Sequence, residues 1–486
     1  MKKISTRILA LLLAALMIFA MLTACTKEEE EKGEEGNGEV TGTEENPGLP
    51  EKDLGGYNFT FITNEGSSYN TGYLMYEGEE GEVLDSAIGR RNKLLEEKYN
   101  VVVNQLRVSD ITTEVRAQVM GGATEFDVIL ASCGKLANMA QENLLYNLLD
   151  IETFNWDASY WDSNSKDQLK IGSKLYFANC ALNIHSIGFS VFFNKKLVED
   201  FQLDNPYELI ENNEWTLDNW AKMVTAVSVD VNQDGQMTEL DQYGNYIEHH
   251  NMRMFFYASG LRATTNDETG YPQVTLMSDG DKTVNLFEKL KSVFTNTASS
   301  YCIVCQNPSF PESFSHKYAY ARYLFTQDLC LFLYMDVNSL SAFAEMESEF
   351  GVLPFPKYDQ NQTVHKTIYP YNNNLLAIPS SAENIEQTAF LLEDMNYFSS
   401  FTVVPAWFDT LLTRRYVRDD ESEETLHLLR NNCVYDIGLY YDFGGLRSQL
   451  LDVDPATSNI SRNFARVEKA INAQIKKIYK DFDEFK

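Results

Sequence analysis

The sequence predicts an α/β fold whose core is a parallel sheet. The run 126–131 is short and nearly all apolar, as expected of a strand that is buried on both faces of a parallel sheet. Strand and helix patterns also alternate before it, with a strand at 57–63, helical spacing at 83–99 and a second strand at 101–108. A helix predicted at 136–148 continues the alternation, which indicates βαβ units.

The rest of the chain shows the same mixture of elements. Thr216 is a suitable N-cap for a helix in which Leu217, Trp220 and Val224 fall on one face. Further predicted strands lie at 185–194, 329–334 and 375–379, with a hairpin-like segment around 266–272. Further predicted helices lie at 114–120, 195–201, 254–261, 283–294, 385–398, 421–430 and 464–482. A chain of 486 residues has room for two or three domains.

The first 24 residues have the layout of a secretory signal peptide, with basic residues ahead of the apolar run 8–22. A membrane-spanning helix needs about 20 apolar residues, so this run is too short to span. Leu22-Thr23-Ala24-Cys25 resembles the lipobox of bacterial lipoproteins, which implies cleavage before Cys25 and diacylation of its thiol. The alternative is an ordinary signal peptide followed by an incidental Cys. Two acyl chains anchor a protein stably, so we expect the mature chain at the extracellular face of the cytoplasmic membrane.

Residues 25–54 are expected to form a disordered linker after the lipidated Cys25, ahead of a folded part at 55–486. The linker is rich in Glu and has almost no large apolar residues, so it cannot bury a core. The whole chain has a formal net charge of −31. This charge makes nucleic acid, anionic lipid headgroups and acidic substrates poor partners, so membrane contact is expected through the lipid alone.

The seven cysteines are too few for a disulfide scaffold in a chain of this length, but an oxidising compartment would allow a Cys302–Cys305 or a long-range bridge. Cys302 and Cys305 have the spacing of zinc and redox motifs, but no second such pair or paired His lies near them. A structural or incidental role is therefore expected for these two residues. The sequence does not determine any pairing among Cys133, Cys180, Cys302, Cys305, Cys330 and Cys433.

The segment 230–241 has the pattern of a calcium-binding loop. Residues that carry side-chain oxygens stand at loop positions 1, 3, 5, 9 and 12, and Gly235 permits the tight turn at position 6. The segment resembles the dockerin-type variant of the EF-hand loop, and an ordinary polar turn is the alternative. The predicted ligands of one structural Ca²⁺ are Asp230, Asn232, Asp234, Gln236, Thr238 and Asp241. No other cofactor is expected.

Several short segments stand in the order in which a known family has them. They are Phe126-Asp127-Val128-Ile129, Leu148-Leu149-Asp150, Phe193-Asn194-Lys195, Trp215-Thr216-Leu217-Asp218, Phe350-Gly351-Val352-Leu353-Pro354-Phe355-Pro356-Lys357 and Ala377-Ile378-Pro379. This ordered set resembles the extracellular solute-binding proteins of ABC importers, in particular the carbohydrate-associated group. The resemblance covers roughly residues 55–450, and the order of the segments is more specific than any one of them.

The resemblance implies a two-lobed, type II periplasmic-binding-protein-like fold with a hinge and an interlobe cleft. By the same resemblance, lobe 1 is expected near 56–186 and 326–374, lobe 2 near 188–325 and 375–450, and C-terminal helices at 451–486. The implied protein is a monomer and not an enzyme. It would close over a small solute, with a sugar or oligosaccharide as the expected ligand, and deliver it to ABC transporter permease subunits.

Sugar sites combine aromatic rings with polar side chains, and ligands of open α/β sheets lie beyond the carboxyl ends of strands. On this basis we select residues that follow predicted strands, flank the hinge or come from the second lobe. The predicted ligand-binding residues are Asn64, Ser132, Lys135, Trp161, His185, Asp336, Asn338, Tyr371, Trp407, Tyr435 and Asp436. Between His185 and Phe189 there is no acidic counterpart of the sugar-contacting hinge Glu of maltose-binding members, which argues against a maltose-type specificity.

Two other functions fit an exported chain: a glycan-active surface enzyme, and a surface adhesin or sensor module. The sequence contains no His-Glu-x-x-His, Gly-x-Ser-x-Gly or phosphate-loop motif. With 71 Asp and Glu residues, some close carboxylate pair is expected by chance and says nothing about hydrolysis. A binding protein needs no reactive group, so we favour that interpretation.

Overall fold

A computed structural model of the protein describes residues 46–66, 74–75, 83–122, 125–183, 187–248, 250–303, 310–408, 417 and 419–485. The chain divides into two units, 1–44 and 45–486, and the description that follows concerns the second. The predicted signal peptide 1–24 and the predicted lipidation site Cys25 lie outside the described residues. Within the described residues, no helix combines the length and the apolar composition needed to cross a membrane.

The first sheet has four strands in the order β13-β3-β1-β2. They are β1 (Tyr57–Asn64), β2 (Val101–Val108), β3 (Val128–Ser132) and β13 (Asn374–Ala377). β1 pairs in parallel with β2 and β3, whereas β13 runs antiparallel to β3. The strands predicted at 57–63 and 101–108 thus join the 126–131 run in one sheet and run parallel to it. β3 is buried along almost its whole length because helices cover the sheet.

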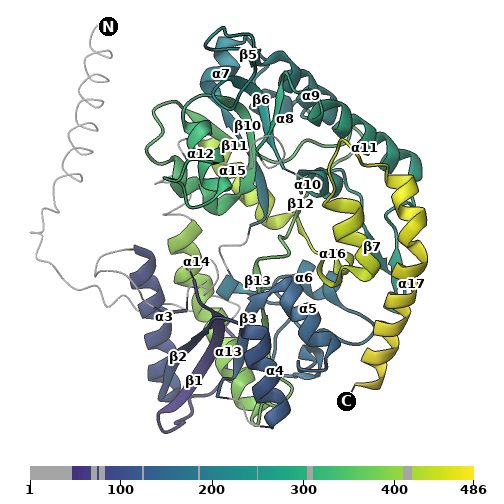
Figure 1. Ribbon diagram of the computed structural model, residues 1–486. Coiled ribbons are helices and arrows are strands. Elements are labelled where there is room, and N and C mark those ends of the chain that lie inside the picture. Colours follow the sequence, from purple (N-terminus) through teal and green to yellow (C-terminus); the bar gives the residue numbers. More distant parts are fainter. Residues whose placement is uncertain are drawn as a thin grey trace, which may run out of the picture. The chain divides into compact units, whose positions relative to one another are not determined.

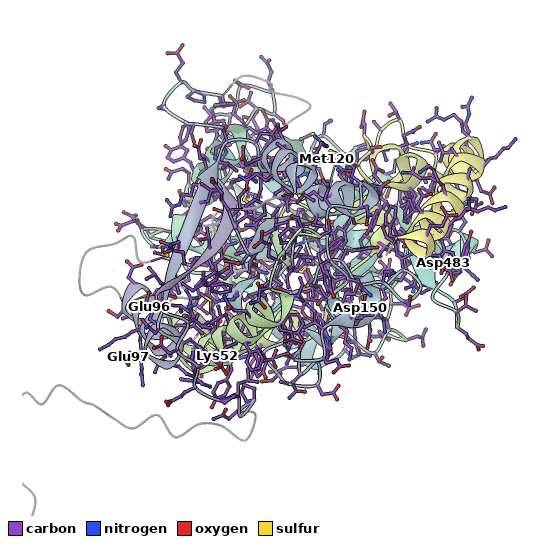
Figure 2. The ribbon with its side chains drawn as sticks, turned by 90° about the horizontal axis from the view of Figure 1, so that it is seen from below. Lys52, Glu96, Glu97, Met120, Asp150 and Asp483 are labelled. Carbon is purple, nitrogen blue, oxygen red and sulfur yellow. The ribbon has the colours of Figure 1, made fainter. Side chains whose placement is uncertain are left out.

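Four helices accompany this sheet: α3 (Val83–Tyr99), α4 (Ile111–Gly121), α5 (Cys133–Gln141) and α13 (Ile385–Phe401). α3 connects β1 to β2 and α4 connects β2 to β3, as βαβ units require. Asp110 caps α4 by accepting hydrogen bonds from the N–H groups of Thr112 and Thr113. On α3, Leu95 is buried while Glu97 is exposed, and Figure 2 shows Glu97 at the periphery beside Glu96.

The second sheet has the strand order β11-β4-β10-β6-β5, with β9 paired to β6. Its strands are β4 (Phe189–Asn194), β5 (Ser228–Val229), β6 (Gln242–Ile247), β9 (Ser300–Cys302), β10 (Cys330–Asp336) and β11 (Phe350–Leu353). β6, β9 and β10 are parallel to one another, while β4 and β5 run antiparallel to their neighbours. Asp336 and Glu248 therefore lie at the same edge of the sheet, because Asp336 ends β10, Glu248 follows β6, and these two strands are parallel.

The helices of the second sheet come largely from the middle of the chain (Figure 1). They are α7 (Lys195–Asp200), α8 (Pro206–Glu211), α9 (Leu217–Ala226), α10 (Asn251–Ala258), α11 (Gly280–Phe294), α12 (Lys317–Thr326) and α15 (Asp420–Asn431). α9 packs on β6, α12 on β10 and α15 on β11. Thr216 occupies the N-cap position of α9 as predicted, but its side chain makes no capping hydrogen bond.

Short elements connect and cover the two sheets. They are β7 (Thr264–Asn266), β8 (Pro272–Val274), β12 (Thr367–Ile368), β14 (Cys433–Val434), α6 (Ser163–Leu169), α14 (Val403–Pro405), α16 (Ile437–Tyr441) and α17 (Ile460–Glu484), with 3₁₀ turns that include η2 (Ala181–Asn183) and η3 (Val337–Phe343). β12 pairs with β14 beside the segment that leads into β13. α17 packs against α11, β8 and α5, so it contacts elements associated with both sheets.

The predicted division of the chain into lobes is wrong after residue 326. β10 and β11 were expected in the first lobe, but both join the second sheet, where they pair on either side of β4. β13 and α13 were expected in the second lobe, but β13 pairs with β3 and α13 packs on α3. The cause is that sheet membership depends on backbone hydrogen bonds to strands far away in sequence, which local periodicity does not contain.

Candidate functional site

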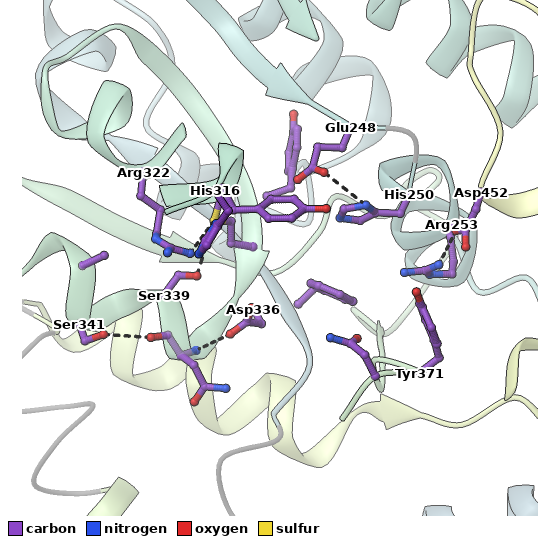
Figure 3. A pocket seen from close by; sticks show the side chains of 17 residues that line it. Glu248, His250, Arg253, His316, Arg322, Asp336, Ser339, Ser341, Tyr371 and Asp452 are labelled. Carbon is purple, nitrogen blue, oxygen red and sulfur yellow. Dashed lines mark hydrogen bonds and ion pairs between the residues drawn. The ribbon is translucent and has the colours of Figure 1, made fainter. Parts of the chain in front are cut away.

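A cavity of about 770 Å³ lies at the edge of the second sheet, where Tyr371 and Asn372 precede β13 (Figure 3). A volume of this size falls within the range of about 300–1,000 Å³ that small-molecule sites occupy. Aromatic, charged and small polar side chains line it together. The lining residues are Phe189, Glu248, His250, Arg253, His316, Tyr318, Arg322, Tyr334, Met335, Asp336, Asn338, Ser339, Ser341, Ala342, Tyr371, Asn372 and Asp452.

Arg322 and Asp336 face this cavity without forming an ion pair. Among the described residues no carboxylate lies within ion-pair distance of Arg322, whose Nη1 lies 4.0 Å from the Met335 sulfur. Asp336 caps η3 by accepting a hydrogen bond of 3.0 Å from the Asn338 N–H. Burial raises the pKa of Asp336 and lowers the pKa of Arg322, and in each case the charge of the other residue opposes the shift. The two side chains are available to donate to and accept from a polar ligand.

Glu248 and His250 form a second polar group on the cavity wall. Nδ1 of His250 lies 3.5 Å from a carboxylate oxygen of Glu248 (Figure 3). The centroids of the His250 and Tyr318 rings are 6.3 Å apart. Glu248 is only 8% exposed. Burial raises the pKa of Glu248 to about 7, although a hydrogen bond with Tyr318 and the charges of Lys317 and Arg253 oppose the rise. Glu248 therefore changes its charge near neutral pH.

Tyr371 is held at the cavity by a cluster of charged side chains. The guanidinium carbons of Arg253 and Arg447 lie 5.1 and 4.3 Å from the centroid of its ring. Asp452 pairs with Arg253 and lies 3.6 Å from Arg447. The cluster connects α10, the segment before β13 and the chain near 447–452. It therefore holds the Tyr371 ring in place where the chain passes from one sheet to the other.

The structure places three of the predicted ligand-binding residues, Asp336, Asn338 and Tyr371, on this cavity. Trp161 lines a different cavity of about 500 Å³. His185 lies outside the described residues. Whether the three cavity residues contact a ligand stays a prediction.

Asn64, Ser132 and Lys135 lie together at the carboxyl edge of the first sheet, but they line neither cavity. Nζ of Lys135 donates to the Asn64 side chain at 2.9 Å. Their edge adjoins the larger cavity, because the N–H of Gly134 donates to the Tyr371 carbonyl at 3.2 Å. The parallel order of β1 and β3 explains why these residues meet.

Trp407, Tyr435 and Asp436 are buried and line neither cavity. The Asp436 carboxylate accepts hydrogen bonds from the N–H groups of Ala263, Thr264 and Gly438 and from the Thr264 hydroxyl. Tyr435 donates to Asp162 at 2.7 Å. Asp436 thus has a structural role in place of the predicted ligand contact, since its oxygens are used by the backbone around β7.

The segment 230–241 connects β5 to β6. Asp230 accepts hydrogen bonds from the N–H groups of Asp234 and Gly235, and Asp241 accepts from those of Val231 and Thr238. Over the described part of the chain, no group of three or more His, Cys, Asp or Glu side chains is placed to hold a metal ion. The residues present include amide, hydroxyl and carbonyl oxygens as well, so a calcium ion on this loop stays a prediction.

Cys302 is disulfide-bonded, whereas Cys133, Cys180, Cys330 and Cys433 are free and buried. Burial raises the pKa of each of the four free thiols. These four cysteines therefore pack as small apolar side chains, as expected of sparse, buried cysteines.

Sequence reasoning missed Glu248, His250, Arg253, Arg322 and Asp452. Glu248 follows β6, so recognition of a strand at 242–247 would have selected it by the rule that ligands lie beyond carboxyl ends of strands. Arg322 lies on α12, which was not predicted. Asp452 comes from the C-terminal region, and no local signal connects it to the cavity.

No protein-family model matches the chain, and no curated protein matches its sequence. Its fold is similar to several solved structures. A cyclo/maltodextrin-binding protein complexed with maltotetraose is 13% identical, with a TM-score of 0.55 over 89% of this chain and 97% of that one. A sugar transporter from Rhizobium etli in an open conformation is 13% identical, with a TM-score of 0.53 over 87% and 99%. UgpB from Mycobacterium tuberculosis in complex with glycerophosphocholine is 14% identical, with a TM-score of 0.51 over 87% and 99%.

At sequence identities of 13–14%, these similarities establish a shared fold and nothing further. The predicted resemblance to the carbohydrate-associated solute-binding proteins is therefore confirmed for the fold. The chain therefore has the type II periplasmic-binding-protein fold.

Proposed function

We propose that the protein is a lipid-anchored extracellular binding protein. It captures a sugar or oligosaccharide and delivers it to the permease of an ABC transporter by hinge closure. The observation that carries this proposal is the cavity of about 770 Å³ where Tyr371 and Asn372 adjoin the carboxyl ends of β6 and β10. A ligand there contacts the connecting segment as well as the second sheet, so it favours one arrangement of the two sheets over others.

The lining of the cavity supports a polyhydroxyl ligand. Arg322 can donate and Asp336 can accept hydrogen bonds. Because the two side chains are not bonded to each other, both can bind neighbouring hydroxyl groups of a ligand. Phe189 and Tyr318 supply apolar faces for a sugar ring. The cyclo/maltodextrin-binding protein and the Rhizobium etli sugar transporter share the fold, and this likeness is a second support.

The lipid anchor rests on the sequence Leu22-Thr23-Ala24-Cys25 behind the apolar run 8–22. Replacement of the thiol by Cys25→Ser is expected to abolish incorporation of labelled palmitate and to release the exported chain from the membrane fraction. Unchanged membrane retention of the variant without lipid would contradict the anchor and leave the binding proposal standing.

The binding proposal is tested by thermal unfolding of the purified protein with maltose, maltotetraose, glycerophosphocholine and a tripeptide. A ligand at a hundredfold excess over its Kd stabilises the folded state by about 2.7 kcal/mol. We expect stabilisation by a sugar, and we expect Arg322→Gln and Asp336→Asn to remove it. Lys222 and Asp204 form an exposed ion pair of 3.6 Å elsewhere, so Lys222→Gln and Asp204→Asn are matched controls.

Stabilisation by the tripeptide alone would contradict a sugar ligand. Release of new reducing ends from added glycans would show hydrolysis and favour the enzyme alternative. Binding of isolated polysaccharide without any response to small sugars would favour an adhesin.

A further inference from the structure

The cavity of about 500 Å³ that contains Trp161 is separate from the proposed solute site, since the two share no lining residue. Its walls come from the chain before α6, from the connecting segment around η2, from the ends of α13 and α14 and from the end of α15. The residues are Ser159, Tyr160, Trp161, Asp162, Ser163, Asn164, Asn179, Cys180, Ala181, Asn183, Ile187, Ser400, Val404, Arg430, Asn431 and Cys433. It is thus bounded by elements from both sheets and by the chain that joins them.

One polar side chain in this cavity lacks the partners that burial normally demands. Asn183 is 2% exposed, and within the described part of the chain neither its carboxamide oxygen nor its nitrogen has a hydrogen-bond partner. Leaving a buried donor or acceptor unpaired is unfavourable, because each group has given up its hydrogen bonds to water without replacing them. The exception calls for an explanation, because more than nine in ten buried polar groups in native proteins are paired.

The Asp162 carboxylate, which lines the same cavity, does not need a ligand. Asp162 accepts hydrogen bonds from Tyr435 at 2.7 Å, from the Ser165 N–H at 3.0 Å and from Asn179 at 3.4 Å. Arg430 also lines the cavity, and its guanidinium carbon lies 5.6 Å from the centroid of the Phe408 ring. The carboxamide of Asn183 offers a neighbour one hydrogen-bond acceptor, its oxygen, and one donor, its NH₂ group. A hydroxyl group can pair with both, because it donates and accepts hydrogen bonds itself.

We propose that this cavity is a second binding site, for a neutral polyhydroxyl compound of about monosaccharide size, with Asn183 as its central hydrogen-bonding residue. Trp161 and Tyr160 provide an apolar wall against which a sugar ring packs. Because the cavity is bounded by parts of both sheets, its occupant also influences how the sheets are held relative to each other. The proposal does not depend on the identity of the solute in the larger cavity.

Two native thiols on the cavity wall can report its occupancy, although burial raises the pKa of both and makes their modification slow. Cys180 and Cys433 line this cavity, while Cys330 is equally buried on β10 and lines neither cavity. We would treat the full-length protein in detergent with methyl methanethiosulfonate, with or without D-glucose or myo-inositol, and follow each cysteine by mass spectrometry. The probes are expected to slow modification of Cys180 and Cys433 by about tenfold at saturation, with no more than a small effect on Cys330.

Variants separate this site from the larger cavity. In the Asp336→Asn protein, which is altered only at the larger cavity, protection of Cys180 and Cys433 should persist. Asn183→Leu should abolish it, whereas Asn194→Leu, at a fully buried Asn on β4 outside both cavities, should not. If Asn183→Leu does not fold, Ser163→Trp, at an exposed position on the rim, replaces it and should block the probes.

The proposal is overturned if neither neutral probe protects Cys180 and Cys433, or if protection is equal at Cys330. It is also overturned if Cys180 and Cys433 are still protected in both the Asn183→Leu and the Ser163→Trp proteins. In that case the hydrogen-bond partner of Asn183 would be ordered water and not a bound polyhydroxyl compound. If the larger cavity binds no sugar, the modification of Cys180 and Cys433 still tests the second site, because this experiment does not depend on the larger cavity.

Discussion

At the scale of single residues, the cavity is defined by side chains whose burial changes their chemistry. Glu248 shows this most directly, because burial raises its pKa to about 7 from the ordinary value of 4.5. Between these two pH values the folded chain retains a proton that the unfolded chain has released. Folding stability therefore falls as pH rises through this window, and the loss is complete above the folded-state pKa.

Glu248→Gln should remove this contribution, because the amide is neutral at every pH. The free energy of unfolding of the variant relative to wild type should increase by about 2 kcal/mol between pH 4.5 and pH 8. Urea unfolding at the two pH values measures the change. Exposed Glu424→Gln is the control and should show no such difference. An equal effect of Glu248→Gln at both pH values would refute the role of burial.

A second residue-scale case is Gly188, in the segment that enters β4. Its φ is +97°, and a Cβ at this position would lie 2.8 Å from Cγ2 of Thr367. Thr367 in turn exchanges hydrogen bonds with the backbone of Phe189, so it cannot move aside freely. Only Gly combines this backbone conformation with this close approach.

We expect Gly188→Ala to lower the free energy of unfolding by about 2 kcal/mol or more. Thr367→Ala removes the colliding atoms, so the double variant should lose less than the sum of the two single variants. Gly89→Ala on α3, where no atom lies within 4 Å of the added Cβ, should be neutral or slightly stabilising. Strict additivity of Gly188→Ala and Thr367→Ala in urea unfolding would contradict the collision.

At the scale of elements, the connection between β5 and β6 carries the predicted calcium ligands. Its carboxylates already accept backbone N–H groups, which organises the turn, and several other oxygens belong to the same short segment. A cation that binds only the folded loop would stabilise the whole domain by mass action.

Calcium chloride is therefore expected to raise the melting temperature relative to EDTA by a few degrees, with little change in sugar affinity. Asp234→Ala should abolish the calcium response. Asp234 is exposed, so the melting temperature of the variant in EDTA should stay near that of wild type. Identical melting curves of the wild-type protein in calcium and EDTA would remove the calcium site from consideration.

At the scale of the whole molecule, function depends on the segments that pass between the two sheets. The larger cavity lies beside one of them, and the charged cluster around Tyr371 ties that segment to α10 and to Asp452. A ligand that contacts both the connecting segment and the second sheet binds some relative arrangements of the two more tightly than others. It therefore shifts the population toward the arrangement that it binds best.

If the protein closes at a hinge when it binds the solute, as proposed, its radius of gyration should decrease on binding. Small-angle scattering of residues 26–486 with and without the stabilising sugar measures it, and the Arg322→Gln protein, which should not bind, provides the control. A decrease that occurs equally in wild type and Arg322→Gln would not be due to the solute. No decrease in wild type at saturating sugar would contradict delivery by hinge closure.

Much of the local structure could be predicted from the sequence because it depends on neighbouring residues. The helix 83–99 and the strand 101–108 have the bounds of α3 and β2, since apolar periodicity reports directly on which face is buried. Asp336, Asn338 and Tyr371 could be selected for the cavity because they flank buried strands. The likeness of the fold to solute-binding proteins could be inferred because it is spread over an ordered series of short segments.

What the sequence by itself determined is therefore the α/β class, most elements and the residues that end individual strands. Only the tertiary structure decided that β10 and β11 join β4 while β13 joins β3, and that Arg322, Glu248 and Asp452 line one cavity. The physical reason is the range of the interactions. Helix and strand periodicity arise from residues a few positions apart, whereas strand pairing and cavity walls depend on hydrogen bonds and packing between segments a hundred or more residues apart.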